Sequence, residues 1–107
     1  MLDSIKHAYD ELYRICREET DLQRHITKKL ILKHIQEIQT LSEIVLNRDN
    51  FEKTDDHEVI CTEWSDIMKD LLTALEQEDE VLLLDAVAYG ILPFIREVLP
   101  NEEWEVI

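Results

Sequence analysis

Residues 81–95 read VLLLDAVAYGILPFI, and this apolar stretch decides how the chain is expected to fold. One line of a helix is marked by residues at spacings of three and four, namely Leu84, Ala88, Ile91 and Ile95. The other sides carry Leu82, Leu83, Val87, Tyr89, Leu92 and Phe94. A helix that is apolar on most sides is buried on most sides, so the stretch predicts a helix enclosed by several others.

Gly90 and Pro93 lie inside this helix. A proline has no N–H to bond the carbonyl four residues earlier, here that of Tyr89, and its ring crowds that carbonyl. The apolar spacing nevertheless continues in phase through Val98. We therefore expect a kink near Gly90 and Pro93, and we expect Pro100 to end the helix.

Three further helices are predicted upstream of this stretch. The first covers residues 2–17, and its stripe consists of Leu2, Ile5, Tyr9, Leu12 and Cys16. The second covers residues 21–46, and its seam consists of Ile31, Ile35, Ile38 and Val45. The third begins near Thr54 and carries Ile60, Trp64, Ile67, Leu71 and Leu75. The acidic run at residues 76–80 forms the turn into the fourth.

A capping box at residues 20–23 is expected to start the second helix, because the threonine and glutamine side chains there can each bond the other residue's backbone N–H. No repeat or linker divides the chain. The sequence therefore predicts an all-α fold, a four-helix bundle of antiparallel, up-down topology, as one domain over residues 1–107.

Charge is distributed unevenly along the chain. The formal net charge is −14; residues 1–48 hold eight acids and eight bases, and residues 49–107 hold seventeen acids and three bases. Nucleic-acid phosphates would meet a field of their own sign, so direct nucleic-acid binding is disfavoured and a basic protein partner is favoured. The alternative is that the acidic surface only keeps the protein soluble.

The two cysteines, Cys16 and Cys61, lie too far apart for a closely spaced metal-binding pair and are typical of a reducing compartment. Residues 1–15 contain several charges and do not read as a signal peptide. No run approaches the roughly 18 apolar residues of a membrane span. We therefore expect a cytoplasmic protein that does not enter a membrane.

The sequence offers no convincing catalytic or metal-binding constellation. His34 and Glu37 share one helical turn, as in di-iron bundles, but no second copy of the pair exists, and we expect them on a solvated helix face. Other neighbouring acid–base sets are His7 with Glu11, and His57 with Asp56 and Glu58. A single glycine leaves no room for a Gly-rich phosphate loop. We predict no enzyme activity, no cofactor and no metal.

Five residues are candidates for contact with a partner: Leu82, Leu83, Asp85, Tyr89 and Trp104. Asp85 lies among apolar residues, where an unpaired buried carboxylate would be costly. It either reaches solvent or bonds Tyr89 one turn later, or it is held for a basic residue of a partner or of a neighbouring copy. Trp104, beyond Pro100, either packs back on the helices or anchors a partner.

Residues 66–93 read DIMKDLLTALEQEDEVLLLDAVAYGILP. This stretch resembles a small helical module of uncharacterised proteins from Gram-positive bacteria, sometimes motility-associated, in which an acidic turn leads to a helix with an aspartate, an aromatic and Leu-Pro. The resemblance covers about a quarter of the chain, and Gly90 departs from it where a charged residue is expected. It implies a bacterial helical module and transfers no catalytic residue.

These observations predict a protein–protein interaction or scaffold domain that forms a homodimer through the surplus apolar surface of its fourth helix. Two other functions stay open. One is an acidic inhibitor or immunity-type protein that blocks a basic partner. The other is an export chaperone with an apolar groove along its second and fourth helices for a partner helix.

Overall fold

The computed structural model describes residues 2–22, 27–51 and 56–99, and in these ranges every regular element is helical. The elements in chain order are α1 (Leu2–Leu22), α2 (Lys28–Lys33), α3 (Ile35–Leu46), the 3-10 turn η1 (Arg48–Asn50), α4 (His57–Gln77), α5 (Glu80–Asp85), the π-helix η2 (Ala86–Ile91) and α6 (Leu92–Val98). The all-α prediction is confirmed. None of these helices is both long and apolar enough to cross a membrane.

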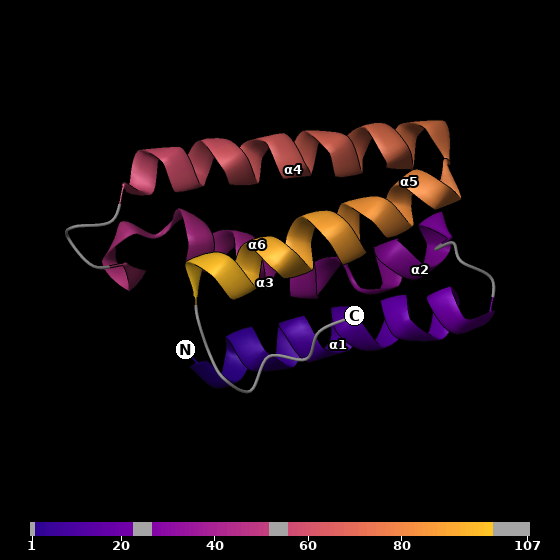
Figure 1. The fold of residues 1–107 in the computed structure, drawn as a ribbon, viewed down its shortest axis with the longest axis horizontal. Coiled ribbons are helices and arrows are strands. Elements are labelled where there is room, and N and C mark those ends of the chain that lie inside the picture. The colour runs from indigo at the N-terminus through magenta and orange to yellow at the C-terminus, as the bar shows by residue number, and fades with distance from the viewer. Residues whose placement is uncertain (1, 23–26, 52–55, 100–107) are drawn as a thin grey trace.

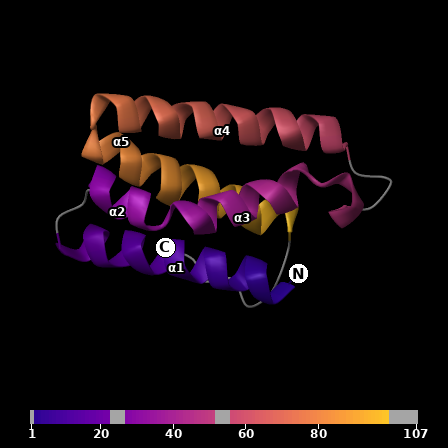
Figure 2. The same ribbon diagram turned by 180° about the vertical axis from the view of Figure 1, so that it is seen from behind.

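The helices lie side by side along the long axis of a molecule measuring 41 × 27 × 19 Å (Figure 1). α1 packs on α3, α3 packs on α4, and α4 packs on α5 and η2. η2 and α6 return to contact α1. Figure 2 shows α2 and α3 on the face opposite to that of α5 and α6 in Figure 1.

The predicted boundary between the first two helices is wrong. α1 continues through Leu22, so Thr20 lies inside a helix and starts none. No glycine or proline interrupts the chain there, so the helix simply propagates past Arg17. The cap belongs instead to Thr27, whose hydroxyl accepts the backbone N–H of Leu30 at 3.2 Å. Gln23, the other end of the expected capping box, lies outside the described residues.

The long second helix is divided at His34. The backbone N–H of His34 is shared between the carbonyls of Leu30 at 3.3 Å and Ile31 at 3.0 Å. The φ and ψ of His34, −108° and 22°, lie outside the α-helical region. A new helix then begins at Ile35. The predicted seam is confirmed on both sides of the break, because Ile31 and Ile38 are buried.

α4 and α5 are joined by a tight turn at the predicted acidic run. Glu78 has φ 52° and ψ 36°, the left-handed conformation that ends many helices. The N–H of Asp79 bonds the carbonyl of Ala74, and the N–H of Glu78 bonds that of Leu75, which together make a Schellman motif. The Asp79 carboxylate then caps α5 by accepting the N–H of Leu82 at 3.1 Å.

The last helical run changes its hydrogen-bonding register at η2. The N–H of Leu92 bonds the carbonyl of Val87, five residues earlier, as in a π-helix. Pro93 consequently falls in the first turn of α6, where a backbone N–H is not required. The structure thus contains a π-helix where the sequence predicted a kink, and the kink stays a prediction.

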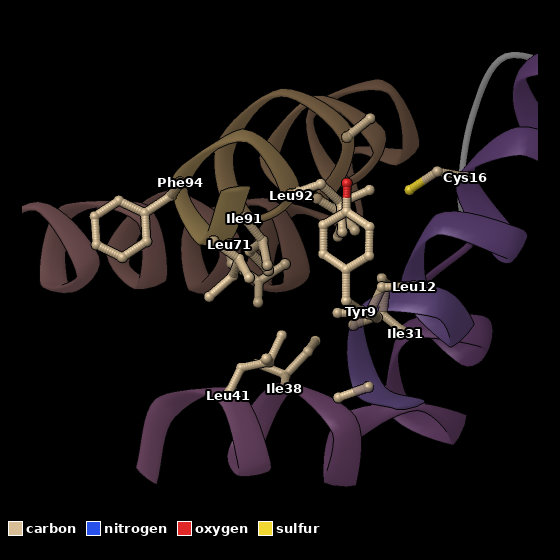
Figure 3. Close-up of a cluster of buried hydrophobic side chains, with 14 of the residues drawn as sticks. Tyr9, Leu12, Cys16, Ile31, Ile38, Leu41, Leu71, Ile91, Leu92 and Phe94 are labelled. Atoms are coloured by element: carbon tan, nitrogen blue, oxygen red, sulfur yellow. The ribbon is translucent and has the colours of Figure 1, made fainter. Parts of the chain in front are cut away.

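The core is formed by one side of every long helix. Figure 3 shows Tyr9, Ile38, Leu71 and Ile91 converging from α1, α3, α4 and η2. The four residues on the predicted line of the apolar stretch, Leu84, Ala88, Ile91 and Ile95, are all buried. Arg96 closes the core on the α1 side by donating a hydrogen bond to the Tyr9 hydroxyl at 2.8 Å.

Candidate interaction groove

Three of the five predicted contact residues lie along one groove. One side is lined by residues of α5 and η2, namely Leu82, Asp85, Ala86, Tyr89 and Gly90, and the other side by Ile67, Asp70 and Thr73 of α4. The hollow has a volume of about 360 Å³. We call it the α4/η2 groove, because these two helices form most of it.

The walls of the groove carry large apolar side chains that the core does not use. Leu82 is 44% exposed and Tyr89 is 66% exposed, whereas Ile67 is partly buried between them and the core. Gly90 keeps the floor open, since a Cβ at this position would lie 3.4 Å from Cγ2 of Ile67. The groove therefore offers apolar surface at the bottom and on one wall.

Two carboxylates line the groove from different helices. Asp70 on α4 and Asp85 on α5 are both exposed, and among the described residues neither has an ion-pair or hydrogen-bond partner. Asp85 thus reaches solvent and does not bond Tyr89. Glu63 and Asp66 precede Asp70 by seven and four residues, so the three acids share one flank of α4 beside the groove.

Of the other two predicted contact residues, the structure describes only Leu83. Leu83 is fully buried in the core, and this placement argues against a direct role in binding. Trp104 lies outside the described residues. The sequence interpretation also missed Asp70, which it counted only among the many acids of the second half, and it placed Ile67 in the core stripe alone.

His34 corrects a second prediction, because it does not lie on a solvated face. Only 9% of its surface is exposed, and its Nδ1 lies 3.7 Å from Oε1 of Glu37 at the junction of α2 and α3. Within the part of the chain that the structure describes, Nδ1 has no hydrogen-bond partner. Among the described residues, no three His, Cys, Asp or Glu side chains are grouped so as to hold a metal ion.

The remaining histidine pairs are engaged in structural contacts. Nε2 of His57 lies 2.8 Å from the carbonyl oxygen of Val45, which ties the start of α4 to the end of α3. Glu11 accepts a hydrogen bond from Arg14 at 2.9 Å, and this bond is the main cause that lowers the pKa of the Glu11 carboxyl. Its partner is therefore Arg14 on the same helix.

Neither cysteine forms a disulfide. Cys16 is buried in the core, and burial raises the pKa of its thiol to about 12. Cys61 is partly exposed, and its sulfur lies 3.7 Å from Nδ1 of His57.

Comparison with known proteins identifies one family. The family described as a domain of unknown function (DUF8042) matches residues 1–100. The match spans most of the chain, far more than the quarter covered by the resemblance seen in the sequence. The Gram-positive origin and the motility association stay predictions. No curated protein and no solved structure matches the chain.

Proposed function

The chain belongs to this family, and we propose that it is a non-catalytic protein–protein interaction domain that binds its partner in the α4/η2 groove. One observation carries the proposal. Most apolar residues of the stretch 81–95 are buried or partly buried in the chain's own core, whereas Val81, Leu82 and Tyr89 are exposed, and of these three Leu82 and Tyr89 line a hollow. Complete burial of a fully exposed large apolar side chain contributes roughly 1.5–3 kcal/mol, and covering the exposed parts of Leu82 and Tyr89 would contribute a share of that each. Such apolar side chains often form the centre of a binding surface.

We further infer that the four helical runs, α1, α2–α3, α4 and α5–η2–α6, pack as an antiparallel, up-down bundle and form a single domain. The contacts of α1 with α3, α3 with α4, and η2 and α6 with α1 support this inference. The unpaired state of Cys16 and Cys61 supports a cytoplasmic setting.

Self-association through the same groove is the second candidate. The exposed Leu82 and Tyr89 favour it, since a second copy would cover them. Asp70 and Asp85 oppose it, because two copies would bring four carboxylates together. Light scattering on the purified chain decides: a mass of twice 12.7 kDa supports the dimer, and a monomer at micromolar concentration overturns it.

Of the other two functions, the acidic inhibitor would use the same groove, because a basic partner could bind the carboxylates of Asp70 and Asp85 that line it. The export chaperone is less well supported. Its mark was an apolar groove along the second and fourth helical runs, whereas the α4/η2 groove lies between the third and fourth.

Photo-cross-linking in the cells that produce the protein tests the proposal. A photoreactive amino acid is placed at position 82, and in a control at position 72, because Leu72 is equally apolar and 58% exposed but lies outside the groove. We expect a discrete cross-linked product from position 82 that disappears when Tyr89→Ala is added. No product from position 82, or the same product from both positions, would overturn the proposal.

A further inference from the structure

The geometry points to a basic amphipathic helix as the occupant of the α4/η2 groove, with one arginine side chain held between Asp70 and Asp85. This inference rests on the proposed function and deepens it by naming the chemistry of the partner. It is carried by the combination of an apolar floor with two carboxylates that lie on separate helices and have no partner among the described residues.

Charge complementarity selects a cationic partner. The groove lining contains two carboxylates and no lysine or arginine. Within the described part of residues 49–107, the bases are Lys69, which is exposed and outside the groove, and Arg96, which bonds Tyr9. Glu63 and Asp66 extend the negative charge along the same flank of α4. Among the described residues no base therefore lines the groove, and both of its carboxylates are available to an incoming cation.

Arginine fits this arrangement better than lysine. A guanidinium is planar and presents five N–H donors, so it can bond two carboxylates that approach from different sides. Its aliphatic stem can cover Leu82 and Ile67, while its planar head can stack on the ring of Tyr89. A lysine ammonium is a compact charge that serves one carboxylate well and makes less use of the aromatic ring.

One wall of the groove has a residue spacing that a partner helix can match. Leu82, Ala86 and Tyr89 follow one another at spacings of four and three residues along one wall. Seven helical residues span about 10 Å, or roughly two turns, at about 1.5 Å per residue. A partner helix with apolar residues at the same spacing would lie along the groove, as in helix-in-groove recognition. Ala86, Tyr89 and Gly90 all belong to the π-helix η2, an irregularity that is frequent at functional sites.

Selection from a library of displayed helical peptides tests the inference. The peptides share an alanine-rich helix, one face of which is randomised, and they are selected on the whole chain. We expect the selected sequences to carry an arginine flanked by apolar residues three or four positions away. We expect Asp70→Asn and Asp85→Asn each to weaken binding about tenfold or more, since hydrogen bonds between charged groups are lost.

Glu76→Gln is the matched control, because Glu76 is an exposed acid of α4 outside the groove. Its affinity for the selected peptides should stay within about twofold of the unmodified chain. Circular dichroism should show that all three variants remain folded, since each replaced side chain is exposed. Equal weakening by Glu76→Gln and Asp85→Asn would overturn the inference, because attraction would then come from net charge alone.

Two further outcomes separate this inference from the proposed function. If the selected peptides carry neutral or lysine residues at the central position, or bind the Asp70→Asn and Asp85→Asn double variant unchanged, the arginine assignment is overturned. If the library yields no binder, the assignment is overturned as well. In either case a cross-link from position 82 in the native cell would leave the groove in place as the binding surface.

Discussion

Replacing the neighbouring leucines Leu82 and Leu83 by alanine, one at a time, separates the groove from the core. Leu83 is fully buried, whereas Leu82 is 44% exposed. Truncating a fully buried leucine costs about 2–5 kcal/mol, because transfer free energy is lost and a cavity is left behind. A half-exposed leucine loses only part of the transfer free energy and leaves no enclosed cavity, so Leu82→Ala should cost about 1 kcal/mol.

Thermal unfolding followed by circular dichroism measures the difference. For a domain of this size, 1 kcal/mol lowers the Tm by roughly 4–8 °C. Leu83→Ala should therefore lower the Tm by about 10 °C or more, and Leu82→Ala by about 5 °C. Leu83→Val is a milder core variant should the alanine variant fail to fold.

The two variants should behave in the opposite way in binding. With a photoreactive amino acid placed at position 89 in place of position 82, Leu82→Ala should weaken the cross-link, because it removes an apolar side chain from the wall of the groove. Leu83→Val, measured below its Tm, should leave that cross-link intact. Equal losses of Tm for the two alanine variants, or loss of binding by a folded Leu83 variant, would refute the assignment of these residues.

Substitutions at three other positions test separate features. Glu78→Gly should raise the free energy of unfolding by about 1 kcal/mol in urea titrations, because glycine adopts the left-handed conformation without the penalty of a Cβ. Glu78→Ala is the control, because it removes the same charge but keeps the Cβ, and it should not raise the free energy of unfolding. Equal values for the two variants would contradict the explanation. Gly90→Ala should raise stability by about 0.5–1 kcal/mol while weakening binding, since the new methyl contacts Ile67 and fills the groove floor; a lower Tm would count against it. Because the pKa of the Cys16 thiol is raised in the folded state, the thiol stabilises the fold fully below its ordinary pKa, and this contribution is lost as pH rises from about 9 towards 12. The free energy of unfolding of Cys16→Ala should therefore fall less steeply with rising alkaline pH than that of the unmodified chain. Parallel curves of unfolding free energy against pH would contradict this explanation.

The helical content and the core stripes could be predicted because they depend on spacing within single helices. Trp64 and Leu71 were placed on the buried side of their helix, and both are buried. The helix ends were harder. Thr20 and Thr27 can each cap a helix, and the neighbouring sequence does not indicate that only Thr27 acts as a cap. No glycine or proline lies near His34, so the sequence gives no signal for the break there. The break is visible only in the structure, where the N–H of His34 is shared between two carbonyls.

The groove could be predicted only in part, because it depends on how two helices pack. Leu82, Asp85 and Tyr89 were recognised from their own helix, where they depart from the core line. Adjacent Leu83 could not be told from Leu82 by composition, since both lie off that line and only the packing of the neighbouring helices buries one of them. Asp70 carries no distinguishing mark in the sequence, and it gains its meaning only when α4 places it opposite Asp85.

The uneven distribution of charge along the sequence becomes an uneven distribution over the surface of the folded chain. Residues 1–48, with equal numbers of acids and bases, build α1, α2 and α3, whereas residues 57–85, which build α4 and α5, hold nine acids and one base. α1 and α4 lie on opposite sides of the molecule (Figures 1 and 2). Among the described residues, the excess negative charge therefore lies on the side of α4. A positively charged partner would be turned towards that side before contact, within a Debye length of about 8 Å at physiological ionic strength. Added salt should accordingly slow its arrival far more than it hastens its departure.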